Sequence, residues 1–125
     1  MSEPRSAMVG LHHVQLAMPP DDEGEAVKFY GAILGLQQIE KPEELSPLGG
    51  VWFRSGELEI HIGIEEHFRP AVRAHPAFLV RGLDLLTARI EAAGYRVEHP
   101  APMEGFERVY VRDPFGNRVE LMEPA

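Results

Sequence analysis

The sequence predicts an α+β fold in which one module, a strand, a helix and three further strands, occurs twice. The main evidence is a repeat distance. Gly35, which is placed to end a helix, precedes Gly94 by the same number of positions as His61 precedes Glu120. A second observation is the length of 125 residues, which allows one domain with a real hydrophobic core but no separate second domain.

A polar tail, residues 1–8, is expected to be flexible and to precede a single domain over residues 9–124. The first predicted strand, residues 11–16, alternates apolar and polar side chains. Because helices should cover its apolar face, His13 points to the more polar face. His12 lies on the packed side, so we assign it no chemistry.

A helix and a hairpin complete the first module, about residues 9–65. Their expected ranges are 25–34 for the helix and 51–54 and 57–64 for the hairpin strands. The helix has an apolar stripe, and Asp21 or Asp22 is its candidate N-cap. In the closing strand, His61 lies on the polar face, which Glu59 shares as a rim charge exposed to solvent.

The second module, about residues 74–123, repeats this order. Its expected elements are a strand at 75–80, a helix at 84–93 and hairpin strands at 108–112 and 117–122. Asp113 and Gly116 shape the hairpin turn. Glu120 lies on the polar face of the closing strand, at the position that matches His61 in the first module.

The repeat predicts a metal site. His75 begins the strand that matches the strand of His13, and the spacing of these histidines is slightly longer because the turn at 19–22 is longer. A repeat brings equivalent positions together around a pseudo-twofold axis. Two imidazoles and the Glu120 carboxylate converging there would hold a divalent first-row metal and leave positions open for substrate oxygens.

Composition limits the partners. The net charge of -8 and the pI near 5.2 argue against nucleic acid or an anionic membrane, because both recruit basic patches. The chain contains no cysteine, so a metal must be held by nitrogen and oxygen. Neither a signal peptide nor an apolar run of about 18 residues is visible, so we expect a cytoplasmic protein.

Three motifs resemble the vicinal oxygen chelate superfamily, which includes glyoxalases, fosfomycin-resistance thiol transferases, extradiol dioxygenases, methylmalonyl-CoA epimerases and bleomycin-binding proteins. The motifs are GLHHVQLA at 10–17, AVKFY at 26–30 leading to LGL at 34–36, and VRDPFGNRVEL at 111–121. The last is the most specific. The resemblance covers residues 9–123, nearly the whole chain.

The resemblance implies that the two βαβββ modules form a half-open mixed sheet around a central cavity with a divalent metal. Its matched ligand positions are His13, His75 and Glu120, which are the residues that the repeat also selects. The metal would be Zn, Ni, Mn, Fe or Co. Related proteins cover the concave face and the strand edges with a second copy, so we expect a homodimer.

The remaining candidates line the cavity. His61 occupies a position where several isomerases of this superfamily have Glu or Gln, so it is either a further ligand or a catalytic base. Gln15 and Tyr110 are expected beside the metal, where they would bind a substrate oxyanion. Either Phe53 or Trp52 faces the pocket, and we choose Phe53. Arg108, or Arg112 on the same face, would bind an acidic group of the substrate.

The resemblance favours a metal-dependent enzyme that acts on a small substrate chelated through neighbouring oxygens. Isomerase, lyase, transferase and dioxygenase reactions all stay open. Glyoxalase-like isomerisation is less favoured because position 61 is His and not a carboxylate residue. Thiol transfer is less favoured because the chain ends soon after Glu120. Ring cleavage is less favoured because the chain is expected to contain a single domain. The alternative is a protein of the bleomycin-resistance type, which sequesters a small molecule without metal or catalysis.

Overall fold

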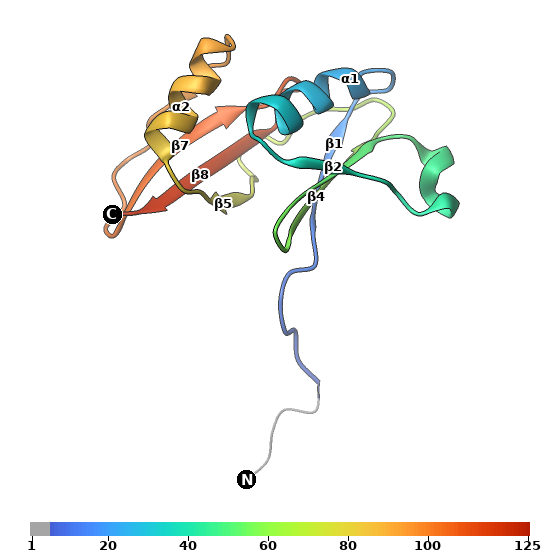
Figure 1. Cartoon of the computed structure of the whole chain (residues 1–125), viewed down its shortest axis with the longest axis horizontal. Helices are drawn as coiled ribbons and strands as arrows, with labels where there is room; N and C mark the ends of the chain where they lie inside the picture. Colours follow the sequence, from blue (N-terminus) through green and yellow to red (C-terminus); the bar gives the residue numbers. More distant parts are fainter. Residues whose placement is uncertain (1–5) are drawn as a thin grey trace.

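The computed structural model describes residues 6–125 and contains two four-stranded mixed sheets (Figure 1). The first sheet has the order β1 (Val14–Met18), β4 (Leu58–Ile64), β3 (Val51–Ser55) and β2 (Gln37–Ile39). The second has the order β5 (Ala77–Leu79), β8 (Arg118–Pro124), β7 (Phe106–Arg112) and β6 (Val97–Glu98). The two orders are equivalent, so the predicted α+β fold of two βαβββ modules is confirmed. The sheets are open and do not close into a barrel.

The strand registers align the two modules residue by residue. In the parallel pair β1–β4, Gln15 lies opposite His61, and in the matching pair β5–β8, Ala77 lies opposite Glu120. In the antiparallel pairs, Trp52 lies opposite His61, and Tyr110 lies opposite Glu120. His61 and Glu120 therefore occupy equivalent positions, and so do Trp52 and Tyr110.

The helix of each module ends at a glycine. In the first module, α1 (Glu23–Ala26) continues directly into the π-helical η1 (Val27–Ile33), and α2 (Leu83–Ala92) is its counterpart. Gly35 and Gly94 follow these helices with φ angles of 81° and 93°, a conformation that glycine adopts at little cost. The predicted cap residue Asp22 occupies the N-cap position, but its side chain makes no capping hydrogen bond.

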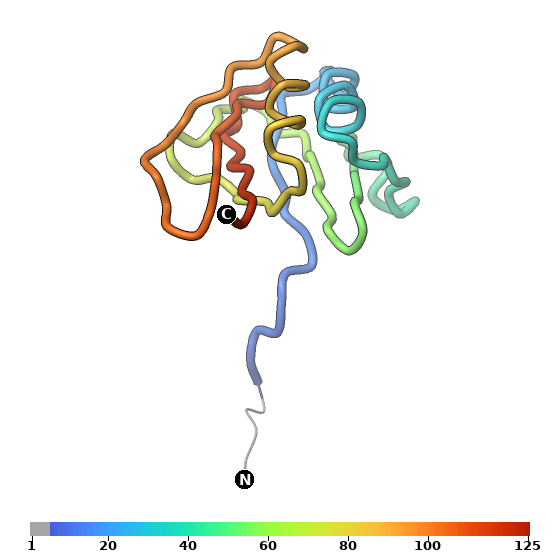
Figure 2. The backbone as a smooth tube through the Cα atoms, turned by 60° about the vertical axis from the view of Figure 1, so that its left-hand side comes forward, coloured from blue at the N-terminus to red at the C-terminus, as the bar shows by residue number. Residues whose placement is uncertain are grey.

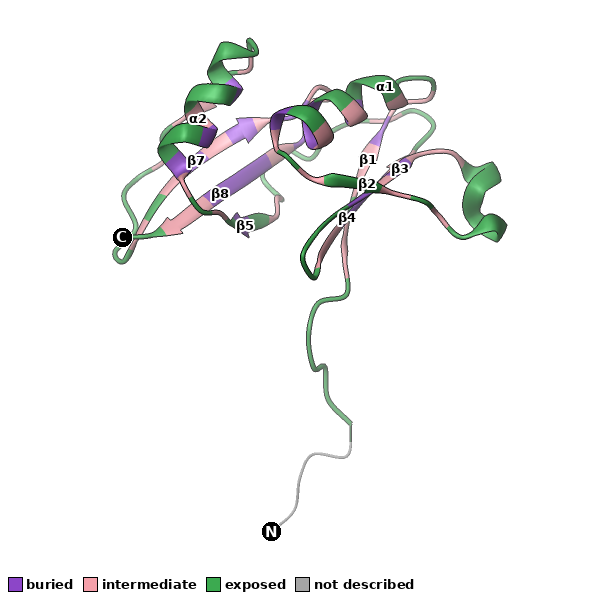
Figure 3. Ribbon diagram, viewed as in Figure 1, coloured by how far each residue is buried: buried purple, intermediate pink, exposed green. Residues whose placement is uncertain are grey.

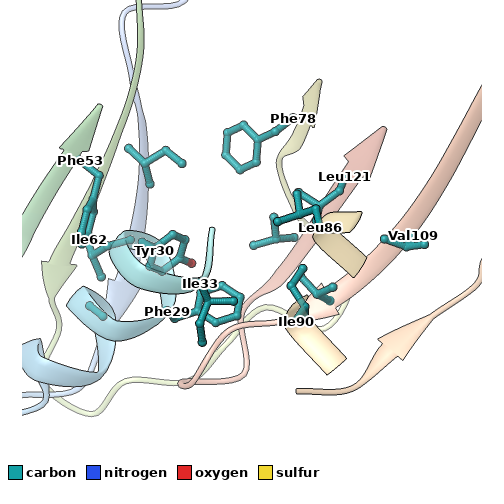
Figure 4. Packing of buried hydrophobic residues seen from close by; sticks show 14 of the residues in the cluster. Phe29, Tyr30, Ile33, Phe53, Ile62, Phe78, Leu86, Ile90, Val109 and Leu121 are labelled. Carbon is teal, nitrogen blue, oxygen red and sulfur yellow. The ribbon is translucent and has the colours of Figure 1, made fainter. Parts of the chain in front are cut away.

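Both helices pack between the two sheets and create one shared core (Figure 4). Phe29 and Ile33 of η1 lie between Ile62 of the first sheet and Leu121 of the second (Figure 4). Figure 3 shows buried residues in strands of both sheets and in both helices. The polar side chains of both sheets therefore lie on the faces turned away from this core.

A buried polar network joins the two modules. The Tyr30 hydroxyl donates to Asp113 Oδ2 at 2.7 Å, and the Asn117 amide donates to the Ala17 carbonyl at 2.8 Å. Asp113 also accepts from the Asn117 side chain and from the backbone N–H groups of Phe115 and Asn117. Burial raises the pKa of the Asp113 carboxyl, and these donors oppose that rise. The turn between β7 and β8 is thereby tied to η1 and to β1.

Two strands start later than the sequence predicts. β1 begins at Val14, so His13 lies just before it, and the described segment ahead of β1 extends away from the domain (Figure 2). β5 begins at Ala77, because Pro76 has no N–H group to donate to a strand ladder. Residues 1–5 of the predicted tail lie outside the described residues. Within residues 6–125, no helix has the length and apolarity that crossing a membrane requires.

One further helix was not predicted. The loop at 41–50 contains a short 3-10 helix, η2 (Glu43–Leu48), ahead of β3. Gly49 and Gly50 follow it with φ angles of 74° and 86°. A Cβ atom on Gly50 would lie 2.3 Å from the Ile62 carbonyl oxygen, so only glycine allows this close approach to β4.

Candidate functional site

In the second module, His75 and Glu120 are in direct contact. His75 Nε2 lies 2.9 Å from Glu120 Oε1, and the His75 Nδ1–H group donates to the Arg73 carbonyl oxygen at 2.7 Å. A carbonyl oxygen only accepts, so Nδ1 carries a proton, and in the neutral ring Nε2 presents a lone pair to the carboxylate. Two lone pairs that face each other require a proton or a metal cation between them.

Arg108 fixes the second oxygen of Glu120. Its Nη1 lies 3.0 Å from Glu120 Oε2, and its Nη2 donates to the Ala101 carbonyl oxygen at 2.6 Å. Burial by itself raises the pKa of Glu120, but its interactions with His75 and Arg108 outweigh burial and lower the pKa below its ordinary value. Glu120 is therefore an ionised carboxylate with one oxygen held by Arg108 and the other facing His75.

Tyr110 lies beside this pair. Its ring meets the His75 ring edge to face, with centroids 5.1 Å apart, and its hydroxyl lies 3.4 Å from Arg108 Nη1. The guanidinium carbon of Arg118 lies 4.6 Å from the centroid of the Tyr110 ring. Tyr110 thus stands between two cationic side chains, next to the histidine of the candidate metal pair.

In the first module, His61 lies in a stack of aromatic rings. Its centroid is 3.6 Å from that of Trp52 and 4.0 Å from that of His13, and both rings are nearly parallel to it. Two rings this close cannot share one face, so His61 is sandwiched between them. Its Nε2 lies 3.0 Å from Glu59 Oε1, and it is only 3% exposed.

Glu59 and His13 have shifted pKa values around this stack. The hydrogen bond with His61 lowers the pKa of Glu59, so the carboxylate is ionised and accepts from His61 Nε2–H. This leaves Nδ1 of a neutral His61 as the basic nitrogen. Burial, His61 and His12 all lower the pKa of His13, which favours the neutral imidazole that binds metals.

The three predicted metal ligands and His61 therefore meet as two pairs. The structure brings His75 to Glu120 and His13 to His61, one pair in each module. Within residues 6–125, no three histidine or acidic side chains lie close enough together to hold a metal ion. The three proposed ligands do not form a complete site within one chain in this structure.

Among the predicted substrate residues, Phe53 lies on the wrong face. It is fully buried in the core, opposite Ile60 and 5.6 Å from the Tyr30 ring, because its side chain points to the helices. Its neighbour Trp52 takes the polar face beside His61. The prediction placed Phe53, and not its neighbour Trp52, in the pocket. The observed register shows the opposite orientation, because Trp52 pairs with His61 and Phe53 pairs with Ile60.

Gln15 lies on the polar face of β1, as predicted. A Cβ atom on Gly63 would come within 2.6 Å of Gln15 Nε2, so the glycine leaves room for this side chain. Gln15 lines a cavity of about 330 Å³ together with His75 and Arg118. One cavity thus contains an amide, an imidazole and a guanidinium from both modules.

Sequence reasoning missed two residues of these clusters, Glu59 as a partner of His61 and Arg118 as a neighbour of Tyr110. Each precedes the central residue of its closing strand, His61 or Glu120, by two positions and so lies on the same face. The alternation of side chains along each strand could therefore have placed both residues beside the central residue.

Residues 10–121 match the model of the Glyoxalase/Bleomycin resistance protein/Dioxygenase superfamily. The chain is similar to a solved protein described as a glyoxalase family protein from Bacillus anthracis, with 46% identity, a TM-score of 0.92 and coverage of 98% of this chain and 100% of that chain. Two structures at 22% identity share the fold. They are a glyoxalase/dioxygenase from Nostoc punctiforme (TM-score 0.77; coverage 98% and 99%) and a fosfomycin resistance protein from Listeria monocytogenes (TM-score 0.76; coverage 95% and 96%). No curated protein matches the chain.

Proposed function

This chain belongs to the Glyoxalase/Bleomycin resistance protein/Dioxygenase superfamily, and we propose that it is a divalent-metal-dependent enzyme that acts on a small substrate chelated through two neighbouring oxygens. The observation that carries the proposal is the His75–Glu120 pair, in which an imidazole nitrogen and an ionised carboxylate face each other at 2.9 Å. Nitrogen and oxygen donors of this kind suit Zn, Ni, Mn, Fe or Co.

The surroundings of the pair support a metal. His75 donates its Nδ1–H to the Arg73 carbonyl, the outer hydrogen bond that typically orients a metal-binding histidine. Arg108 holds the remaining oxygen of Glu120. Both donor atoms therefore have fixed directions before any metal arrives.

We propose His13 of a second copy as the third ligand. β1 and β5 are edge strands of their sheets, and each has one side without a partner strand among the described residues. Pairing of β1 with β5 of a second copy would cover both edges and bring His13 of one subunit toward His75 and Glu120 of the other. A homodimer built this way contains two equivalent sites.

When bound, the metal would act as a Lewis acid on the substrate oxygens. The chain supplies the proton transfer: Glu59 accepts the Nε2–H of His61 and leaves Nδ1 to take a proton from the carbon beside the bound oxygens. Trp52 stacks on His61 and fixes the plane of its ring. This assigns His61 as a base, and it supports an isomerase or lyase reaction over sequestration.

Metal content tests the proposal. Protein purified without chelator should contain about one divalent ion per chain, and His13→Ala or Glu120→Ala should lose it while remaining folded. His99→Ala, which changes an exposed histidine in the loop after β6, is the matched control. Metal that persists in the His13→Ala, Glu120→Ala double variant would overturn the site.

Proton exchange tests the reaction. Metal-loaded protein should exchange the acidic C–H of one class among α-hydroxyketones, hemithioacetals, catechols and acyl-CoA thioesters in deuterated solvent, and His61→Gln should abolish the exchange but keep the metal. Loss of metal on His61→Gln would make His61 a ligand. Tight binding of an aromatic drug by metal-free protein, without turnover of any class, would favour the sequestering alternative.

A further inference from the structure

Arg118 has a buried hydrogen-bond donor without a partner. Its Nε atom is buried and, like that of Arg108, makes no hydrogen bond to the described residues. Unlike Arg108, Arg118 has no carboxylate among these residues as an ion-pair partner. A buried donor without a partner is costly, so the position of Arg118 calls for an explanation.

The equivalent residue of the first module shows the contrast. Glu59 precedes His61 by two positions, as Arg118 precedes Glu120, and Glu59 is fully engaged by His61 and Arg54. Arg118 instead lies 4.6 Å from the centroid of the Tyr110 ring, a contact that holds the guanidinium without using its N–H groups. Its hydrogen-bonding capacity remains available.

Arg108 does not fill the anion-binding role predicted for it. Its Nη atoms bind Glu120 and the Ala101 carbonyl, so its charge is already neutralised by a carboxylate. The pKa of Arg108 is raised chiefly by the hydrogen bond to Glu120. Arg108 is therefore a positioning residue for Glu120, whereas Arg118 forms no ion pair with a carboxylate of the described residues.

Arg118 faces a cavity that can hold a ligand. It lines the space of about 330 Å³ that also contains His75 and Gln15, and the volume suits a small molecule. Arg69 adds a second positive charge to the lining, and Glu65 supplies its negative charge. A ligand here would contact Arg118 and the metal-facing His75 at the same time.

We propose that Arg118 binds an anionic group of the substrate, a carboxylate, phosphate or phosphonate that lies beside the metal-chelating oxygens. The planar guanidinium fork suits such a group, because two of its N–H donors can bind two oxygens at once. The position of this anionic group beside a metal rests on the proposed function. The anion site itself is a property of Arg118 and its cavity.

Nuclear magnetic resonance of the arginine Nε–H groups tests the site, with inorganic phosphate as the probe and chloride at the same ionic strength as the reference. The Arg118 Nε–H signal should shift and saturate on phosphate addition. Arg118→Gln should weaken phosphate binding at least about 10-fold, which corresponds to about 1.4 kcal/mol. Arg118→Lys should restore part of it, and Arg96→Gln, which changes an exposed arginine outside the lining of this cavity, should not alter it.

The outcomes separate this inference from the proposed function. Phosphate binding that is equal in wild type and Arg118→Gln, or a shift that grows linearly without saturation, overturns the anion site while leaving the metal assignment intact. Saturable binding at Arg118 in protein that never holds a metal supports the anion site and contradicts the metal-dependent enzyme. Saturable binding together with bound metal supports both.

Discussion

The polar faces of the two modules have the same backbone but opposite chemistry. In the first, His61 is stacked between the rings of Trp52 and His13, with Glu59 in contact with its Nε2. In the second, the equivalent Glu120 is an ionised carboxylate held by charged and polar donors. In the proposed function, one scaffold thus presents a base on one face and an anionic metal ligand on the other.

The comparison shows how a repeat can divide the work of one site. Equivalent positions do not need equivalent residues, because only the strand register is repeated. His61 and Glu120 share a place opposite an aromatic residue, Trp52 in one module and Tyr110 in the other. Under the proposed function, a complete site needs one face from each module, and two copies of the chain would supply both.

The largest expected difference comes from replacing the central residue of each face, Glu120 or His61, by glutamine. Glu120→Gln should lower the metal content from about one ion per chain to below about 0.1, because it removes the ionised oxygen that faces His75. His61→Gln should leave the content unchanged. Elemental analysis of both variants decides the comparison, and equal losses would show that the two faces do not have separate roles.

The second prediction compares how much the hairpin turns of the two modules contribute to the free energy of unfolding. Asp113→Ala in the second module leaves several buried donors, including the Tyr30 hydroxyl, without an acceptor. The free energy of unfolding should fall by about 2–3 kcal/mol. Ser55→Ala, in the exposed turn of the first module, should change it by less than about 0.5 kcal/mol. Urea denaturation measures both, and a small Asp113→Ala effect would show that the network is not essential.

The smallest effect concerns the orientation of His61. Glu59→Gln should remove the preference for the Nε2–H tautomer, because an amide can donate as well as accept. It should slow substrate C–H exchange by about 10-fold and leave the metal content unchanged. The 15N chemical shifts of the His61 ring report the tautomer, with Glu57→Gln as the control. An unchanged tautomer would remove Glu59 from the mechanism.

The fold could be predicted from the sequence because side-chain direction in a strand is a local property. Alternation placed His61 and Glu120 on polar faces, and the glycine spacing found both helices. The register between strands is not local. It decides that Trp52 and not Phe53 lies beside His61, and that His13 contacts His61 and not His75 within one chain.

Contacts between neighbouring strands of one module were also beyond local reasoning. The engagement of Arg108 by Glu120 depends on the pairing of β7 with β8, and the contact of Arg118 with the Tyr110 ring depends on the same pairing. Strand parity placed the side chains on a face. Strand parity did not show which of the charged side chains form an ion pair with a neighbour.

The central claim, a metal site shared between two copies, is tested most directly by mixing two inactive variants. His13→Ala and Glu120→Ala homodimers should each bind no metal. After unfolding and refolding together, the mixed dimers should recover one intact site of the two, because one site combines both substitutions and the other has neither. Recovery of about half the wild-type metal content per mixed dimer is the predicted result. No recovery in dimers shown to be mixed would contradict a shared site.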